Sequence, residues 1–302
     1  MGSIQSLVVR RNAAPAHRIV LIVLMVQLLG LQCAWTQELP ETHIKEELIK
    51  QERIYRSNDV VPRGYVTNRG LSAYAELLPT GFCDALGKLG SSDRWLDVGA
   101  GSGQAILDYY APKDDDPAGK KCAGAGAKGR AVAISIEDRR TDQWQKLAAS
   151  LDDERIRYLA GKRLSQYSLE ELGKFRIITD VFGGFTYTEN LSRFLDNVLS
   201  LLQVGGEFYT LMPGVKLEYG SQKLGILYLT ELEDAIGRPE KVCSWLKKTT
   251  CTEISCESKS DWKRPTEVIK VRKVCSDTSV PRMKLVEFEA GYPPSRRFAL
   301  DQ

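Results

Sequence analysis

Residues 95–103 read Trp95-Leu96-Asp97-Val98-Gly99-Ala100-Gly101-Ser102-Gly103. A strand over residues 94–98 is predicted to end near Asp97, and the three glycines that follow allow a tight turn in which the backbone approaches a ligand. A helix predicted over residues 104–110 points its N-terminus, with free N–H groups and a positive dipole, at the same place. Because ligands of open α/β sheets bind beside the carboxyl ends of strands, this stretch predicts a site for a nucleotide-like ligand or an amino-acid carboxylate.

Strands and helices alternate on both sides of this turn. The predicted strands cover residues 94–98, 130–136, 156–160, 175–181 and 207–212. The predicted helices cover residues 104–110 and 141–151, followed by a helix whose apolar stripe is Leu191, Phe194, Leu195, Val198, Leu201 and Leu202. Thr188 is the expected cap of that last helix, and Gly205-Gly206 its expected end. Such alternation predicts an α/β fold with a mostly parallel sheet and right-handed crossovers.

The remaining segments are assigned by composition and spacing. Residues 72–89 are predicted to be a helix interrupted near residues 79–81, residues 113–128 a surface loop, and residues 219–236 a helix. Two late strands, residues 267–274 and 284–289, have no long helix between them. We therefore expect them to pair as an antiparallel closing hairpin.

The glycine pattern separates two families of ligand-binding turn. A dinucleotide fingerprint read from Gly101 and Gly103 requires glycine at position 106, which is Ile106. The match is instead to Asp-x-Gly-x-Gly-x-Gly, and residues 202–209 (LQVGGEFY) also resemble the same family. Over residues 72–298 the chain resembles the class I (Rossmann-like) S-adenosylmethionine-dependent methyltransferases. The resemblance implies a three-layer sandwich, a seven-stranded mostly parallel sheet with a C-terminal antiparallel hairpin, and S-adenosyl-L-methionine as cofactor.

The resemblance also implies roles for individual residues. The residues expected to face the methionine end of the cofactor are Asp97, Gly99, Ala100, Gly101 and Gly103. The acid that holds the ribose aligns most simply with Ser135, so Glu137 nearby is the candidate; a second acid, near the adenine, is replaced by Lys162-Arg163. Asp180 could contact the cofactor or act as general base, and Tyr187 could orient a substrate. The alternative is that Asp180 caps a turn and the aromatic side chains pack in the core.

Composition narrows the classes of function. The net charge of +3 over 302 residues and the lack of a basic stripe give no indication of a nucleic-acid partner. His17 and His43 are the only histidines, and both precede the predicted domain. This argues against a Ser-His-Asp or Cys-His hydrolase and against a His-rich metal site.

Residues 1–36 are predicted to be a signal peptide or a membrane anchor. Arg10, Arg11 and Arg18 precede the apolar run 19–31, which is short for a spanning helix. The plainer alternative is a buried N-terminal helix. Residues 37–71 are expected to form a helical or extended segment, with an amphipathic helix over residues 40–55, and residues 72–302 the methyltransferase-like domain.

The cysteines are consistent with export. Loss of Cys33 with the leader leaves six: Cys83, Cys122, Cys243, Cys251, Cys256 and Cys275. An even number in an exported chain predicts disulfides of open connectivity. Zinc bound by the last four cysteines and free buried thiols are the alternatives. We therefore expect a secreted or extracytoplasmic protein, with a single-pass anchored form as the second possibility.

The sequence favours a methyltransferase whose acceptor, a small molecule or a protein side chain, is unknown. No metal is expected, and contact with a membrane is expected only through an uncleaved leader. The first alternative is a secreted non-catalytic binding module on a degenerate methyltransferase fold. A nicotinamide-dependent oxidoreductase is the second, and Ile106 argues against it.

Overall fold

The computed structural model describes residues 39–56, 69–124, 126–151, 155–213, 230–259, 266–291 and 294–301. Residues Glu38–Gln302 form one compact unit. The predicted leader, residues 1–36, lies outside the described residues, and the domain limits at residues 36 and 71 stay predictions. No helix in the described ranges has both the length and the apolar character needed to cross a membrane.

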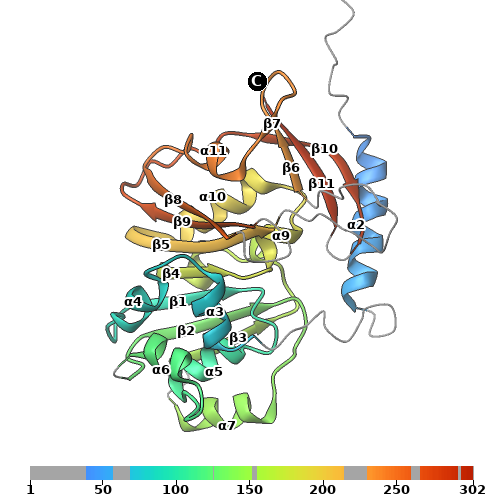
Figure 1. Cartoon of the computed structure of the whole chain (residues 1–302). Coiled ribbons are helices and arrows are strands. Elements are labelled where there is room, and N and C mark those ends of the chain that lie inside the picture. The colour runs from blue at the N-terminus through green and yellow to red at the C-terminus, as the bar shows by residue number, and fades with distance from the viewer. Residues whose placement is uncertain are drawn as a thin grey trace, which may run out of the picture. The chain divides into compact units, whose positions relative to one another are not determined.

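The main sheet has seven strands in the order β3-β2-β1-β4-β5-β9-β8 (Figure 1). They are β1 (Arg94–Val98), β2 (Arg130–Ser135), β3 (Ile156–Ala160), β4 (Phe175–Asp180), β5 (Leu202–Pro213), β8 (Thr252–Lys259) and β9 (Thr266–Lys273). From β3 to β5 all neighbours pair in parallel, whereas β9 pairs antiparallel with both β5 and β8. Within this described sheet β9 alone runs against the others, so the predicted seven-stranded, mostly parallel α/β fold is confirmed.

Helices cover both faces of the sheet. They are α2 (Glu41–Arg56), α3 (Leu71–Leu77), α4 (Phe82–Gly87), α5 (Gln104–Tyr110), α6 (Pro117–Ala123), α7 (Asp142–Ser150), α8 (Leu169–Leu172), α9 (Gly184–Tyr187), α10 (Leu191–Leu201) and α11 (Val242–Leu246), with a 3₁₀ turn at Leu164–Gln166. Side chains alternate between the faces of a strand. In β1, Trp95 packs with α3 to α7, whereas Leu96 and Val98 pack with α8 to α11. The two apolar clusters therefore define the three layers.

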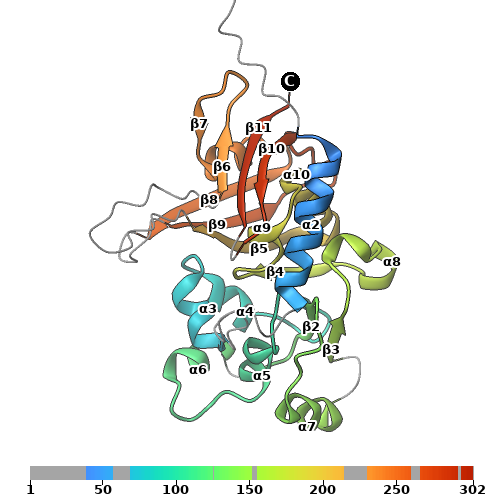
Figure 2. The same cartoon turned by 90° about the vertical axis from the view of Figure 1, so that its right-hand side faces the viewer.

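A second sheet of four strands lies next to α2, in the order β10-β11-β6-β7 (Figure 2). Its strands are β6 (Thr230–Glu233), β7 (Pro239–Glu240), β10 (Met283–Glu289) and β11 (Ser295–Leu300). The wholly buried guanidinium of Arg296 in β11 donates to the carbonyl oxygens of Phe185 and Thr188, and to Thr230 Oγ1 at 2.6 Å. These bonds fasten the second sheet to the segment that follows β4.

The predicted pairing of the two late strands is wrong. The hairpin partner of β9 is β8, which the sequence analysis missed because its outer positions are polar and only half-buried. Val268, Ile269 and Val271 of β9 are wholly buried, so the backbone N–H and C=O groups of this strand need partners on both edges, which β5 and β8 supply. The other late strand, β10, pairs with β11 in the second sheet.

Several local expectations also require correction. The segment 113–128 contains α6, which Asp116 caps by accepting from the N–H of Gly119. Asn190 rather than Thr188 caps α10, and β5 starts at Leu202, directly after this helix, so Gly205-Gly206 lies inside the strand. Of the helix predicted over residues 219–236, residues 219–229 lie outside the described ranges and residues 230–233 form β6.

Three disulfides pair all six cysteines of the unit: Cys83–Cys122, Cys243–Cys256 and Cys251–Cys275. The predicted disulfides are therefore present. The zinc alternative is wrong, because the four C-terminal thiols that it needs are bonded to each other. Cys83–Cys122 joins α4 to α6, and the other two bonds brace α11 and the ends of β8 and β9.

Candidate functional site

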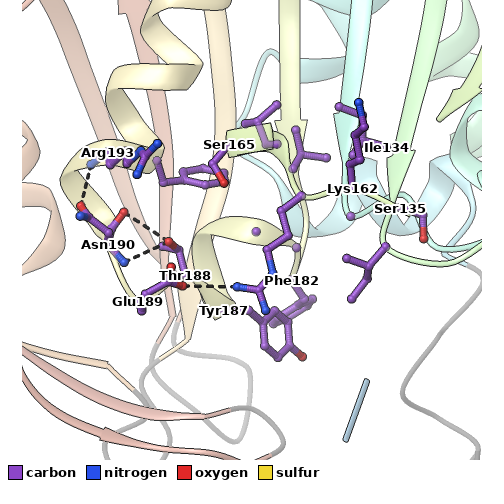
Figure 3. A pocket seen from close by; sticks show the side chains of 18 of the residues that line it. Ile134, Ser135, Lys162, Ser165, Phe182, Tyr187, Thr188, Glu189, Asn190 and Arg193 are labelled. Atoms are coloured by element: carbon purple, nitrogen blue, oxygen red, sulfur yellow. Dashed lines mark hydrogen bonds and ion pairs between the residues drawn. The ribbon is translucent and has the colours of Figure 1, made fainter. Parts of the chain in front are cut away.

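A cavity of about 940 Å³ lies at the carboxyl ends of β1 to β4. Six parts of the chain form its wall. Two are near the N-terminus of the unit: residues 39–41 with Ile44 at the start of α2, and Arg69 just before α3. The others are the end of β1 with the glycine turn (Val98, Gly99, Gly101), the ends of β2 and β3 (residues 134–137, Arg139 and residues 162–165), the segment after β4 (residues 182–184 and 187–190, with Arg193 and Phe194) and residues 283–285 of β10. Ser135 and Lys162 lie on one side of the view in Figure 3, and Asn190 and Arg193 on the other.

The glycine turn has the left-handed backbone that its residues imply. Gly99, Gly101 and Gly103 have φ of +74°, +57° and +77°. A Cβ on Gly99 would lie 2.5 Å from the Cα of Gly183, and one on Gly103 would lie 2.4 Å from the Trp144 ring. The packing of the protein itself therefore requires glycine at two of the three positions. Gly99 and Gly101 line the cavity, and Ala100 and Gly103 do not contribute to its described lining.

Asp97 is wholly buried beneath the turn. Tyr74 Oη donates to its two carboxylate oxygens at 3.0 and 2.9 Å, and Thr179 Oγ1 donates to Oδ1 at 2.7 Å. Burial raises the pKa of Asp97 to about 7, while the bonds from Thr179 and Tyr74 oppose the rise. Asp97 thus supports the turn from below and is not part of the cavity's described wall.

Asp180 ends β4 and is also wholly buried. Its carboxylate accepts the backbone N–H of Gly183 at 3.0 Å and of Phe185 at 3.0 Å, so it organises the turn into α9. Burial raises the pKa of Asp180 to about 7, against the effect of these backbone bonds. The capping alternative describes the geometry that Asp180 adopts, whereas its role as a base stays a prediction. Tyr187 does line the cavity, as an orienting residue would.

Glu137 and the basic pair after β3 all reach the cavity. Glu137 Oε2 lies 2.5 Å from Arg139 Nη2, and its side chain is only partly exposed. Lys162 Nζ is 3.3 Å from Glu171 Oε1, and Arg163 Nη1 is 3.5 Å from Glu189 Oε2. Both cations that replace the expected second acid are therefore neutralised by neighbouring carboxylates.

Tyr158 connects the two predicted halves of the cofactor site. Its hydroxyl donates to the carbonyl oxygen of Gly101 and, at 3.2 Å, to that of Glu137, and accepts from the N–H of Arg139. These hydrogen bonds fix the glycine turn relative to the end of β2. Of the eight predicted residues, Gly99, Gly101, Glu137 and Tyr187 line one cavity, and Asp97 and Asp180 stand behind its wall.

Comparison with known proteins gives similarity of fold only. No family model matches the sequence, and none of the curated proteins matches it. Solved structures that resemble this fold include many methyltransferases.

Two of these structures serve as examples. An rRNA methylase from Streptococcus thermophilus is 10% identical, with a TM-score of 0.38 over 64% of this chain and 94% of that protein. Phosphoethanolamine N-methyltransferase 2 from Haemonchus contortus, solved with S-adenosyl-L-methionine, is 10% identical, with a TM-score of 0.46 over 74% of this chain and 60% of that protein.

The structure adds cavity residues that sequence reasoning missed. Arg69 lines the wall and stacks on the ring of Phe182, with the guanidinium carbon 4.6 Å from the ring centre. Phe182 has φ of +54°, a left-handed backbone that is uncommon for a bulky side chain. Arg193 lines the cavity from the first turn of α10. The Phe-Gly-Gly-Phe run at residues 182–185 was the available signal for the turn, whereas no motif marks Arg69.

Proposed function

We propose that this protein is an S-adenosylmethionine-dependent methyltransferase acting on a small molecule or a protein side chain. The observation that carries the proposal is the strand order β3-β2-β1-β4-β5-β9-β8 with β9 reversed, which places a glycine turn and a large cavity at the ends of β1 to β4. This arrangement is the one that the sequence resemblance implies for class I methyltransferases.

The cavity fits the cofactor on two counts. Small-molecule sites span roughly 300–1,000 Å³, so a volume of about 940 Å³ accommodates the cofactor together with a small acceptor. The turn has no side chain at Gly99 or Gly101, so a ligand can lie close to its backbone, with the N–H of Gly99 itself already donated to the carbonyl oxygen of Ile134. Glu137 on the partly exposed wall can accept from ribose hydroxyls. Glu137 would then exchange part of its bond with Arg139 for the ligand.

Gly99, Gly101 and Glu137 would hold the cofactor, which would supply an activated methyl group for transfer to a nucleophilic atom of the acceptor. The protein's own contribution is position and exclusion of water. Tyr187 and the segment after β4 line the space where the acceptor would lie, and residues 39–41 with Ile44 of α2 close one side of it.

The sheet also disfavours the oxidoreductase alternative. A dinucleotide-binding sheet has the order 3-2-1-4-5-6, built from two mononucleotide-binding halves. Here the position beyond β5 is taken by β9, which runs antiparallel and closes the sheet with β8. The second mononucleotide-binding half is therefore absent from the described sheet.

The test is calorimetric titration of S-adenosylhomocysteine into the full-length protein with its disulfides formed. We expect saturable one-to-one binding that Glu137→Gln weakens by about tenfold or more, since a hydrogen bond to a charged group contributes ~1.5–3 kcal/mol. Glu253→Gln, on the exposed face of β8, is the matched control. No heat of binding from a protein with a cooperative thermal transition, or a thermal shift given by NAD alone, would overturn the proposal.

We further infer that the chain is exported. The support is the pairing of all six cysteines of residues Glu38–Gln302, since disulfides persist in oxidising compartments. Expression with the native leader tests the inference. Protein recovered outside the cytosol and starting after residue 30 is expected, and cytosolic protein that still carries Met1 contradicts it.

A further inference from the structure

Cationic side chains outnumber acidic ones on the wall of the cavity. Three are acids: Glu41, Glu137 and Glu189. Six are cations: Arg69, Arg139, Lys162, Arg163, Arg193 and Lys284. A cavity with this excess attracts anions, because the field is focused by the low-dielectric walls.

Four of the six cations already have carboxylate partners. Arg139 pairs with Glu137 and Arg163 with Glu189, as described above, and Lys162 pairs with Glu171. Lys284 Nζ lies 2.9 Å from Asp301 Oδ1. These side chains are held by the protein, so they are not the first candidates for binding a ligand.

Arg69 and Arg193 differ from the other four. Neither makes an ion pair with any residue in the part of the chain that the structure describes. The buried Asp97 exerts a favourable field on Arg69, but its oxygens accept from Tyr74 and Thr179. Two arginines thus line the same cavity without a carboxylate partner in the described residues.

Structural stability does not explain Arg193, and for Arg69 the structure shows a cation–π contact with Phe182. Arg193 lies in the first turn of the eleven-residue helix α10, where the positive end of the helix dipole disfavours a cation. Arg69 is held against Phe182, whose left-handed backbone is itself unfavourable. Strained residues of this kind concentrate at ligand sites, where binding compensates for the strain.

We propose that the methyl acceptor carries an anionic group, a carboxylate or a phosphate, and that Arg69 and Arg193 bind it. This inference rests on the proposed methyltransferase function. Arg193 follows β4 and lies across the cavity from Ser135 and Lys162 at the ends of β2 and β3, where the cofactor is assigned (Figure 3). A guanidinium presents paired N–H donors that match both carboxylate and phosphate oxygens.

The experiment uses inorganic phosphate and malonate as separate probes, each titrated into the full-length protein with and without saturating S-adenosylhomocysteine, at constant ionic strength. We expect at least one probe to bind. Arg69→Gln and Arg193→Gln should each weaken that probe by about tenfold or more and leave the affinity for S-adenosylhomocysteine unchanged. The matched control is Arg157→Gln, an exposed arginine on β3 that does not line the cavity. The preferred probe distinguishes a phosphate from a carboxylate.

Three results would overturn the inference while the proposed function stands. In the first, S-adenosylhomocysteine binds and neither probe does. In the second, the probes bind equally to the wild type and to both variants. In the third, the arginine variants weaken the binding of S-adenosylhomocysteine but not that of 5′-methylthioadenosine, which lacks the carboxylate; the arginines would then recognise the cofactor. Failure of the proposed function has a different signature, because folded wild-type protein would then not bind S-adenosylhomocysteine at all.

Discussion

The third glycine of the turn offers a matched pair of substitutions. Gly103 has φ of +77°, and Gly237, in the turn between β6 and β7, has φ of +76°. A Cβ on Gly103 would lie 2.4 Å from Trp144, whereas a Cβ on Gly237 would have no heavy atom within 4 Å. Alanine therefore introduces the same backbone strain at both positions, and a steric contact at Gly103 alone.

The expected losses of stability follow from the backbone strain and the steric contact. A non-glycine residue with a left-handed backbone destabilises the folded state by about 1–2 kcal/mol. Alanine also reduces the conformational entropy of the unfolded chain, which stabilises the folded state by about 0.4–1 kcal/mol. Gly237→Ala should therefore lower the free energy of unfolding by about 0–1.5 kcal/mol. Overpacking against a buried ring adds about 1–3 kcal/mol for Gly103→Ala. At ~2–4 °C per kcal/mol, the two melting temperatures should differ by about 2–12 °C.

Thermal unfolding followed by tryptophan fluorescence measures this difference, and a third variant isolates the contact. Trp144→Leu removes the ring that the new Cβ would meet, so Gly103→Ala should be less destabilising in that background than in the wild type. Equal melting temperatures for the two alanine variants would refute the reasoning. The requirement for glycine at position 103 would then come from backbone conformation alone.

Three further predictions concern the buried groups. Tyr74→Phe should lower the free energy of unfolding by about 1–3 kcal/mol because Asp97 loses one of its two donors. Urea titrations should show a larger loss at pH 8, where Asp97 is ionised, than at pH 6. Burial raises the pKa of Asp97 from ~3.9 unfolded to about 7, so its contribution is fully present below pH ~4 and falls by up to ~1.4 kcal/mol per unit as the pH rises to 7. In Asp97→Asn the stability should therefore fall less steeply between pH 4 and pH 7 than in the wild type, as measured by the melting temperature. An unchanged slope would contradict this prediction. Replacing Cys83 and Cys122 together by Ser opens a loop with a separation of 39 residues and should cost about 4 kcal/mol in chemical denaturation.

The parallel half of the sheet could be predicted from sequence because each signal in it is local. Four strand positions and the glycine turn follow from short apolar runs bounded by turn residues. The antiparallel half could not be predicted in the same way. Whether β9 pairs with β8 or with β10 depends on which edge is open after β5 has its place, and no single segment contains that information.

The helix α6 shows a second limit of local reasoning. Residues 117–123 (PAGKKCA) have weak helix propensity and two glycines nearby, which indicates a loop. The helix forms because Asp116 caps it, and because Cys122 is wholly buried and bonded to Cys83 in α4. A covalent link between segments 39 residues apart cannot be inferred from the composition of either one.

For the site, sequence reasoning was most effective where function depends on the backbone and least effective where it depends on side-chain surroundings. Asp97 and Asp180 were chosen as acids at strand ends, yet both are occupied by donors from the protein behind the cavity wall. Arg69 and Arg193 belong to no motif, and their significance is visible only when neighbouring carboxylates are located in space. Whether a charged side chain has a partner depends on which residues the fold places beside it.

The same reasoning changes what the glycine motif means. Gly99 and Gly103 are required by contacts with Gly183 and Trp144, so a chain that had lost its ligand would still need glycine at both positions to fold. The motif therefore distinguishes one fold from another, but not an active enzyme from a binding module that keeps the fold. Arg69 and Arg193 have the opposite character, because neither has a carboxylate partner in the described residues and Arg193 lies at the positive end of the α10 dipole, so the fold gives no electrostatic reason for a cation there. The presence of Arg69 and Arg193 on the cavity wall thus favours a binding site over a fold that binds no ligand.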